Sequence, residues 1–407
     1  MANLLIKPTT GQGNKLIIQD QDGGDILTSA DSGATIENAT FPTIKLTPTA
    51  TGSAPSGSEG LLYFDSDKNA LMQYDGSEWL TESRYSETGL SDATGGTISE
   101  YSSGATHYRI HAFYTSGIFT LNGTKSCDIL IVGGGGGGGG RIGGGGGGGA
   151  VFHRAGYSLT IGTYNITVGA GGYGGTNSST PGSMGGSSIA FGVTAYGGGP
   201  GKTRFATNTT DTNRANGGGG CLTSAAGTTG TTLSASGWTY VGGNDGATSE
   251  TANDLPQGGG AGAASNGVAP ASSTSAGGAG GNGTNAVSWA TPESLGREAT
   301  TGTSIRGAFY FAGGGGGSCY TTYAGGVGGN GGGGGASSTY AGGAAAGNYD
   351  LFEDLDGGAQ AGGGQSTGGY GGKNSGGGGG AGAHSGGGAG GGQGGSGIVI
   401  IRYPVTL

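Results

Sequence analysis

Uninterrupted glycine constrains this chain more than any other feature. Runs of eight and seven glycines fill residues 133–140 and 143–149, with only Arg141 and Ile142 between them. Glycine loses more conformational entropy on ordering than any other residue, roughly 1 kcal/mol or more for each residue fixed. A folded structure must therefore give each run neighbours that satisfy its backbone hydrogen bonds.

The extended left-handed threefold helix, polyglycine II, offers such neighbours. It rises about 3.1 Å per residue and has no internal hydrogen bonds, so parallel copies can bond sideways. Side chains do not fit between such helices, which predicts that interior helices are pure glycine. Peripheral helices can carry Ala or Ser on an outer face, and the mixed stretches at 261–262 and 379–383 fit this description. The segments between runs then become surface loops.

Collagen, a flexible linker and a dinucleotide-binding loop each account for the glycine runs less well. Collagen needs Gly at every third residue and abundant proline, whereas here the glycines are contiguous and there are 10 prolines. A flexible linker accounts for the composition but not for the β-type segments that bracket the runs. A dinucleotide-binding loop needs a helix after its glycines. The strand-like Ile129–Val132 leads only into more glycine and then Ala150–Phe152.

Composition and charge exclude several classes of function. Of 407 residues 109 are Gly, and only 10% are charged and 32% hydrophobic, which is typical of disordered or repetitive structural chains. A net charge of −9 without a basic stripe argues against nucleic-acid binding. No apolar run is long enough for a membrane span. Met1–Thr10 is not a conventional secretion signal, so an exported product is expected to leave by another route, such as cell lysis.

The first 104 residues divide into three parts. Residues 1–58 contain short β-type segments, which are Lys15–Gln19 and Asp25–Thr28 around a tight-turn sequence, followed by 34–36 and 43–46. Strands this small need a partner or identical copies to bury a core. Residues 59–85 predict a β-hairpin that Trp79 closes, and the Ser-, Thr- and Gly-rich residues 86–104 predict a linker or neck.

The region 105–407 combines more strands with the glycine runs. Predicted strands lie at 108–113, 118–121, 187–196 and 397–403, with a hairpin at 157–168 that turns near Gly162. Cys127–Val132 is a continuous apolar run, as expected for a strand buried on both faces. We expect an all-β fold without substantial α-helix, in which these strands meet in a small β-sandwich that carries the glycine lattice.

Two stretches carry a resemblance to known proteins. The residues from Gly60 to Trp79, GLLYFDSDKNALMQYDGSEW, are similar to a hairpin module of tailed-phage fibre and tail proteins. The ordered succession of 108–120, 128–133, 162–172 and 394–403 resembles the glycine-rich domain at the distal ends of phage fibre proteins. This second resemblance covers about three quarters of the chain.

The resemblance implies a non-catalytic virion fibre protein, made in the host cytoplasm and located on an external appendage of the particle. It implies a polyglycine-II sandwich whose loops bind a host surface glycan or protein, attachment to other virion tail proteins through residues 1–58, and a homotrimer. No cofactor, metal, nucleic acid or membrane insertion is expected. A head or tail decoration protein and a cellular surface adhesin remain alternatives, with an enzyme such as a depolymerase behind them.

Aromatic side chains in the long polar stretches are the best candidates for receptor contacts, because rings offer large, stiff contact areas. Each ring can instead pin its own loop onto the lattice, and the two tryptophans are expected to be the most exposed. The candidates are Trp238, Tyr240, Trp289, Tyr320, Tyr323, Tyr340, Tyr349, Phe352 and Tyr370.

The remaining chemistry-bearing residues fit simpler structural roles. The acidic stretch 349–356 predicts a solvated loop or one helical turn, or else a cation or basic-loop contact. Residues 65–69 begin like a calcium loop, but Ala70 stands where that loop needs Gly, so a hairpin turn is favoured. The three cysteines have no metal-ligand spacing and predict isolated thiols, with one disulfide as the alternative. Four histidines provide no recognisable catalytic arrangement.

Overall fold

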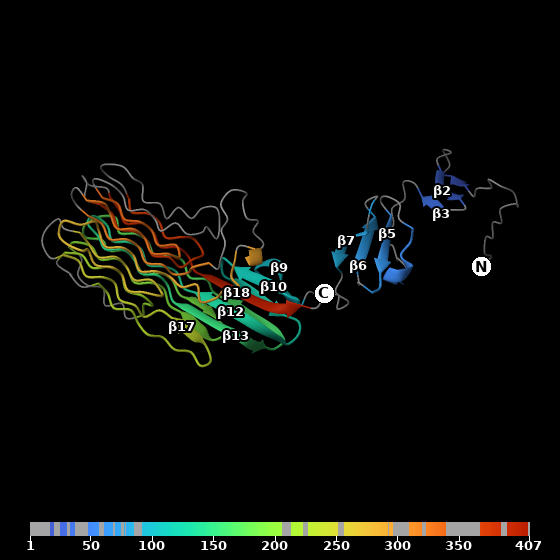
Figure 1. Cartoon of the computed structure of the whole chain (residues 1–407), viewed down its shortest axis with the longest axis horizontal. Coiled ribbons are helices and arrows are strands. Elements are labelled where there is room, and N and C mark those ends of the chain that lie inside the picture. Colours follow the sequence, from blue (N-terminus) through green and yellow to red (C-terminus); the bar gives the residue numbers. More distant parts are fainter. Residues whose placement is uncertain are drawn as a thin grey trace. The chain divides into compact units, whose positions relative to one another are not determined.

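The computed structural model divides the chain into two compact units, Met1–Gly89 and Leu90–Leu407. Figure 1 shows the strands of both. The residues that the structure describes are 17–19, 25–30, 33–36, 48–56, 61–67, 70–74, 77, 79–84, 92–205, 213–222, 227–250, 256–291, 293–295, 309–319, 323–338, 367–383 and 389–405.

The first unit contains two small sheets. Strands β1 (Ile17–Gln19), β2 (Asp25–Ala30) and β3 (Gly33–Ile36) form an antiparallel sheet, which confirms the strands predicted around the first tight turn. The strand predicted at 43–46 lies outside the described residues. The short 3₁₀ turn η1 (Thr51–Ser53) follows β4 (Pro48–Thr49).

The predicted hairpin of residues 59–85 is present and has a third strand. β5 (Leu62–Asp65) pairs antiparallel with β6 (Ala70–Tyr74), which pairs with β7 (Trp79–Arg84), while β4 lies parallel to β5. Trp79 does close the unit, because its ring lies 4.5 Å from that of Tyr63 in an edge-to-face arrangement. Asp65 is buried and accepts hydrogen bonds from the Tyr63 hydroxyl and the Asp67 N–H, as expected of a hairpin turn.

The second unit is built on a β-sandwich. Its larger sheet has the strand order β17-β13-β12-β18-β10-β9, and its smaller sheet has the order β14-β11-β8. The strands are β8 (Ala93–Thr94), β9 (Thr97–Ser103), β10 (Thr106–Phe113), β11 (Gly117–Leu121), β12 (Lys125–Val132), β13 (Val151–Leu159), β14 (Gly162–Ile166), β17 (Thr239–Val241) and β18 (Ile398–Val405), with a separate hairpin of β15 (Ser188–Ala190) and β16 (Val193–Ala195). The prediction of an all-β fold is confirmed.

The central strands β12 and β18 are buried on both faces, as the apolar run of β12 predicts. Ile129 and Ile131 belong to the core between the two sheets, whereas Leu130 and Val132 face a second core on the other side. That second core is covered by side chains from residues 284–312, among them Phe309 and Phe311. The segment 284–312, in its described parts, therefore serves the fold as a cap over the sheet.

Two predictions about strands are wrong. Tyr157–Val168 is not a hairpin, because β13 joins the large sheet while β14 pairs with β11 in the small one. The turn near Gly162 connects the two layers of the sandwich, and the apolar residues on either side of it face one core. The range 86–104 is not a neck throughout, because β8 and β9 lie within it and β9 pairs with β10 along its length. Its Ser and Thr residues occupy an edge strand, where one face meets solvent.

The glycine runs form a lattice of extended segments that backbone hydrogen bonds join side by side. This lattice extends from one end of the sandwich (Figure 1). Successive N–H groups of residues 134–139 donate to three different neighbouring segments in turn, over N···O distances of 2.8–2.9 Å. The donor–acceptor pairs are Gly134 to Gly186, Gly135 to Gly395, Gly136 to Gly147, Gly137 to Ser183, Gly138 to Gly392 and Gly139 to Gly144. The partners recur every three residues, the period that a threefold extended helix requires. The polyglycine-II conformation itself stays a prediction.

The two longest interior segments are pure glycine, as expected. Every residue of 133–140 and 143–149 is buried, and a Cβ on Gly138 would lie 2.1 Å from the carbonyl oxygen of Gly380. The expectation that Ala in mixed stretches faces outward is wrong for Ala261, Ala381 and Ala383, which are almost fully buried. The lattice therefore has positions where a single methyl group fits.

Candidate functional site

The lattice gathers the turns of many segments at one end. Near the sandwich, Gly133 donates to the carbonyl of Ala150, and at the opposite end of the same two runs Gly139 donates to Gly144, where the chain turns back. We call the end around this turn the far end. The loop 177–180 and Lys202 lie at the same end, because Gly140 is packed against Asn177 and Gly139 against the Lys202 carbonyl.

The far end has its own small apolar cluster. Ile142, Cys221 and Leu222 are buried together, and Ile142 adopts a positive φ of 56° that allows the tight link between the two glycine runs. The Cys221 thiol donates to the Ile142 carbonyl over 2.6 Å, and burial raises its pKa to about 12. This thiol is therefore protonated and structural, and the same holds for Cys127, whose pKa burial raises to about 12. None of the three cysteines forms a disulfide, in agreement with the prediction of isolated thiols.

The far-end loops carry aromatic and cationic side chains, and backbone hydrogen bonds connect these loops to each other. Phe205 is 63% exposed, and the Arg204 guanidinium lies over its ring at 5.1 Å. The Phe205 N–H donates to the Ser178 carbonyl, which ties two loops together. Burial lowers the pKa of Lys202, and the nearby Arg214 lowers it further. Phe205 is thus an exposed ring on a loop that a backbone hydrogen bond holds in place.

Three of the nine predicted contact residues lie near the sandwich instead. Trp238 and Tyr240 are half-buried against the core between the sheets, where Trp238 packs against Tyr157 with ring centroids 5.6 Å apart. The Tyr240 hydroxyl donates to the Thr231 carbonyl, and burial raises the pKa of Tyr240. The expectation that the tryptophans are the most exposed rings is wrong for both Trp238 and Trp289, which are partly buried.

Trp289 is also half-buried and packs against the second core. The Arg402 guanidinium lies 4.6 Å from the Trp289 ring and 4.4 Å from that of Tyr108. Arg402 also forms an ion pair with Asp128 at 2.8 Å. Trp289 thus fixes the cap segment onto the sheet through a stacked cation, so its ring is engaged within the fold.

The remaining candidates divide between described and undescribed parts of the chain. Tyr323 is partly buried at the start of a lattice segment, and Tyr370 is 54% exposed. Tyr320, Tyr340, Tyr349 and Phe352 lie outside the described residues, as does the acidic stretch 349–356. Sequence reasoning missed two exposed rings, Phe205 and Tyr173, the latter 75% exposed. Tyr173 stands between Gly172 and Gly174, and this spacing was a signal for it, whereas Phe205 stands between Arg204 and Ala206 and had no such signal.

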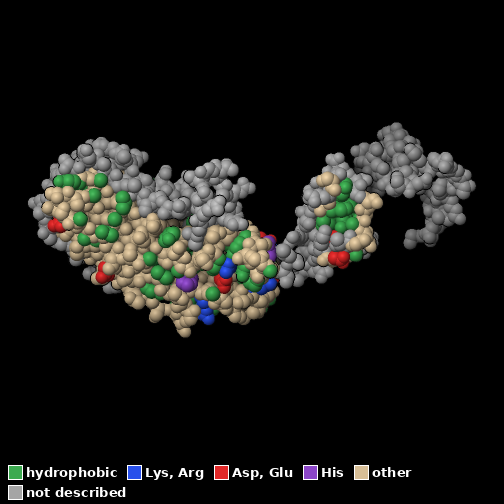
Figure 2. Space-filling view, in the orientation of Figure 1, with side chains coloured by type: hydrophobic (Ala, Val, Ile, Leu, Met, Phe, Trp, Pro, Cys, Tyr) green, Lys and Arg blue, Asp and Glu red, His purple; other side chains and the backbone are tan. Residues whose placement is uncertain are grey.

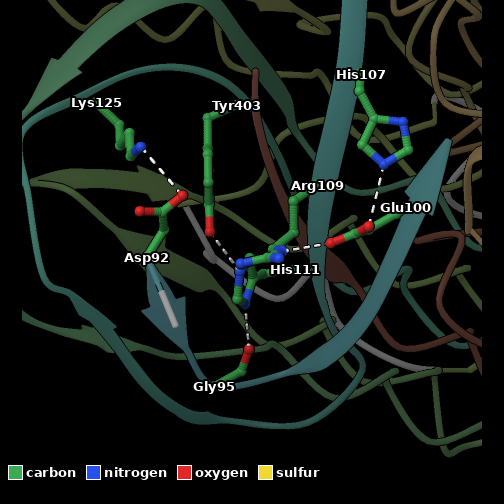
Figure 3. A network of polar contacts seen from close by, with 8 residues as sticks. All are labelled: Asp92, Gly95, Glu100, His107, Arg109, His111, Lys125 and Tyr403. Carbon is green, nitrogen blue, oxygen red and sulfur yellow. Dashed lines mark hydrogen bonds and ion pairs between the residues drawn. The ribbon is translucent and has the colours of Figure 1, made fainter. Parts of the chain in front are cut away.

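A polar network lies at the sandwich, on strands β9, β10 and β18 (Figure 3). Arg109 and His107 both contact the Glu100 carboxylate, at 2.7 and 3.0 Å. Burial alone raises the pKa of Glu100, but the hydrogen bonds from His107 and Arg109 outweigh it, and the net pKa is lowered. Lys125 pairs separately with Asp92 at 3.1 Å. This network connects the edge strand β9 to its neighbour.

His111 is fully buried at the centre of this network. Its Nδ1 lies 2.7 Å from the Gly95 carbonyl oxygen, which only accepts, so Nδ1 carries the proton. Its Nε2 therefore accepts from the Tyr403 hydroxyl at 3.1 Å. Burial lowers the pKa of His111 and raises that of Tyr403 to about 12. Both ring nitrogens are engaged in the neutral form, so the histidine is structural.

The buried His111 predicts an acid-sensitive fold. Its folded-state pKa is lowered below the ordinary value near 6.5, so the unfolded chain binds the proton more readily. Stability is then fully present above pH 6.5 and decreases as the pH falls below it, by at most about 1.4 kcal/mol per pH unit for one proton. We expect urea unfolding between pH 8 and 5 to show this decrease. A His111→Asn variant should show a shallower decrease, the remainder coming from His153, whose pKa burial also lowers; an unchanged slope would contradict the assignment.

Figure 2 shows that the visible face of the second unit carries few charged side chains, most of them over the sandwich. Within the part of the chain that the structure describes, no three His, Cys, Asp or Glu side chains gather as a metal site would require. Among the same residues, no helix has the length and hydropathy of a membrane span.

One comparison with known proteins identifies a family. A family model described as "Glycine-rich domain" matches residues 114–404. This range begins after β10 and extends into β18, so it contains the whole lattice and most of the sandwich. No curated protein matches the chain. The match spans well over half of the sequence, and the chain belongs to the glycine-rich domain family.

Proposed function

We propose that this chain is a non-catalytic fibre protein of a phage virion that contacts the host surface through the far-end loops of its glycine-rich domain. The observation that carries the proposal is the gathering of loops at the far end of a lattice that lateral backbone hydrogen bonds hold together. Because glycine has no side chain, recognition has to come from the inserts, and the lattice holds those inserts in place. A rigid support lowers the entropy lost on binding.

The N-terminal unit supports the attachment role in this proposal. Its two sheets have three and four strands, and the described apolar core of the larger one consists of Tyr63 and Met72 with Ala54 and Trp79 against it. Sheets of this size gain stability from a partner or from copies of themselves. We propose that residues 1–58 dock onto other virion tail proteins and that the chain forms a homotrimer, in which several weak host contacts combine into avidity.

The side-chain chemistry favours binding over catalysis. The thiols of Cys127 and Cys221 are buried and protonated, and both ring nitrogens of His111 are engaged within the fold. None of these groups is available as a nucleophile or base to an outside substrate. At the far end Phe205 is exposed and Arg204 is partly exposed, and groups of this kind are found at protein and glycan contacts.

The proposal predicts competition for the host surface. Full-length protein, added to host cells before the phage, should lower the adsorption rate. Replacing both Arg204 and Phe205 with Ala should weaken this block by roughly five-fold, which corresponds to about 1 kcal/mol of lost contact. Ile161→Ala, at a residue 68% exposed beside the sandwich, is the matched control and should block like the wild type. Full infectivity of particles that lack residues 90–407 would contradict the proposal and favour a decoration role.

A further inference from the structure

One side of the lattice carries two exposed tyrosine rings on segments that backbone hydrogen bonds join side by side. Three neighbouring segments make this surface, residues 169–176, 367–373 and 389–397. Gly371 donates to the Gln393 carbonyl over 2.7 Å, and Gly394 donates to the Gly172 carbonyl over 2.8 Å. The segment 389–397 therefore lies between the other two. We call the outward side of these three segments the tyrosine face.

Exposure on this face repeats every third residue. Along 169–176 the exposed positions are 170, 173 and 176, and along 367–373 they are 367, 370 and 373, while most glycines between them are buried. Along the middle segment, Gln393 is exposed and residues 390 and 396 are partly buried. Each segment thus exposes one of its sides, and the residues on that side recur every third position, as a threefold period requires.

The exposed positions line up across the segments. A Cβ on Gly390 would lie 3.9 Å from both the Thr176 Cα and the Thr367 Cγ2, so these three residues form one row. Tyr173, Tyr370 and Gln393 each lie three residues along their own segment from this row. The same register therefore places Tyr370 and Tyr173 on either side of Gln393. The hydrogen bonds from Gly371 and Gly394 hold this register. Two rings therefore flank one amide at a single level of the lattice.

Nothing in the described fold requires these rings. Tyr173 is 75% exposed and Tyr370 54% exposed, and the segments that carry them are held by backbone hydrogen bonds. By contrast, Phe309 and Phe311 are buried beneath the cap. Aromatic side chains held outward on a rigid surface are the kind of group that supplies most of the contact energy in a binding site.

The chemistry of the face fits an uncharged, hydroxyl-rich chain. Its outward side chains are two phenols, the Gln393 amide, the hydroxyls of Thr176 and Thr367, and one formal charge, on Lys373. Phenol rings stack against the C–H faces of sugar rings, and amides and hydroxyls exchange hydrogen bonds with sugar hydroxyls. A single charge provides little attraction for a polyanion. We propose that the tyrosine face is a binding site for a neutral glycan chain, separate from the far-end loops.

Affinity electrophoresis of the full-length protein tests this proposal. Native gels containing a neutral polysaccharide (mannan, dextran or hydroxyethyl cellulose) should retard the wild-type protein with at least one of the three. Tyr173→Ala and Tyr370→Ala should each weaken that retardation by roughly five-fold, the effect of losing about 1 kcal/mol, and the double variant should abolish it. Ile161→Ala, which shortens an apolar side chain that is 68% exposed beside the sandwich, is the matched control and should be retarded like the wild type.

Several results would overturn the proposal. These are migration unaffected by all three neutral polysaccharides, retardation by the anionic alginate alone, or the same loss in Ile161→Ala as in the tyrosine variants. Sedimentation in which the wild type self-associates and the double variant does not would show that a second copy of the chain covers the face. Retardation of a wild-type protein that fails to block phage adsorption would support the glycan site and contradict the fibre function, so the two proposals fail independently.

Discussion

Replacing Gly146 with Ala is expected to destabilise the second unit by more than about 3 kcal/mol, although it adds one methyl group. The added Cβ would lie 2.2 Å from the carbonyl oxygen of Gly136 and 2.7 Å from its carbonyl carbon. Both are backbone atoms, so no side chain can rotate away. The Gly146 N–H also donates to Gly379 and its carbonyl accepts from Gly315, so relief of the clash shifts several segments at once.

The measurement is chemical or thermal unfolding of the full-length variant beside a matched glycine variant. Gly123→Ala is the control, because a Cβ there has no heavy atom within 4 Å and its φ is not positive. It should be neutral or slightly stabilising, since Ala restricts the unfolded chain. An unfolding midpoint for Gly146→Ala within error of that for Gly123→Ala would mean that the lattice is looser than its geometry indicates.

The sequence predicts the glycine lattice well because glycine itself limits the possible structures. Only segments without side chains can approach closely enough for direct backbone bonding on every side, so contiguous glycine marks interior segments. The uninterrupted apolar run of Ile129–Val132 likewise predicts a strand buried on both faces, and β12 is such a strand. These predictions depend on local residue type, which the sequence states directly.

Predictions that depended on which segments meet were less successful. The residues flanking Gly162 have strand patterns, but their spacing does not say whether the two strands pair with each other or join different sheets. Trp238 and Trp289 lie in polar surroundings in the sequence, yet both pack against cores assembled from distant segments. A ring's neighbours in space decide its exposure, and those neighbours lie far away along the chain.

The tyrosine face could be predicted from the sequence only in part. Along 170, 173 and 176, and again along 367, 370 and 373, a non-glycine residue occurs at every third position. That spacing predicts an outward row on a threefold segment. The alignment of two such rows on either side of Gln393 comes from the lateral hydrogen bonds, which only the folded structure reveals.

Strand β18 connects the two cores, and its neighbouring residues Ile400 and Ile401 face opposite ways. Ile401 belongs to the core between the sheets, and Ile400 to the core beneath the cap segment 284–312. Both are fully buried. In a sheet with one solvated face, one of two adjacent residues tolerates a charge. Here the cap covers the second face of the sheet, so neither of the two adjacent residues is expected to tolerate a charge.

Ile400→Asp and Ile401→Asp are therefore expected to be equally damaging, each by more than about 4 kcal/mol, because either leaves a carboxylate in an apolar core without a partner. A loss of this size is a large fraction of the roughly 5–15 kcal/mol that holds a typical domain folded. Unfolding in urea measures it. Ile118→Asp is the matched control, since that side chain is 55% exposed and should cost less than about 1 kcal/mol. A mild effect at Ile400 with a severe one at Ile401 would show that the cap segment opens readily, and that the second face of the sheet is covered only part of the time.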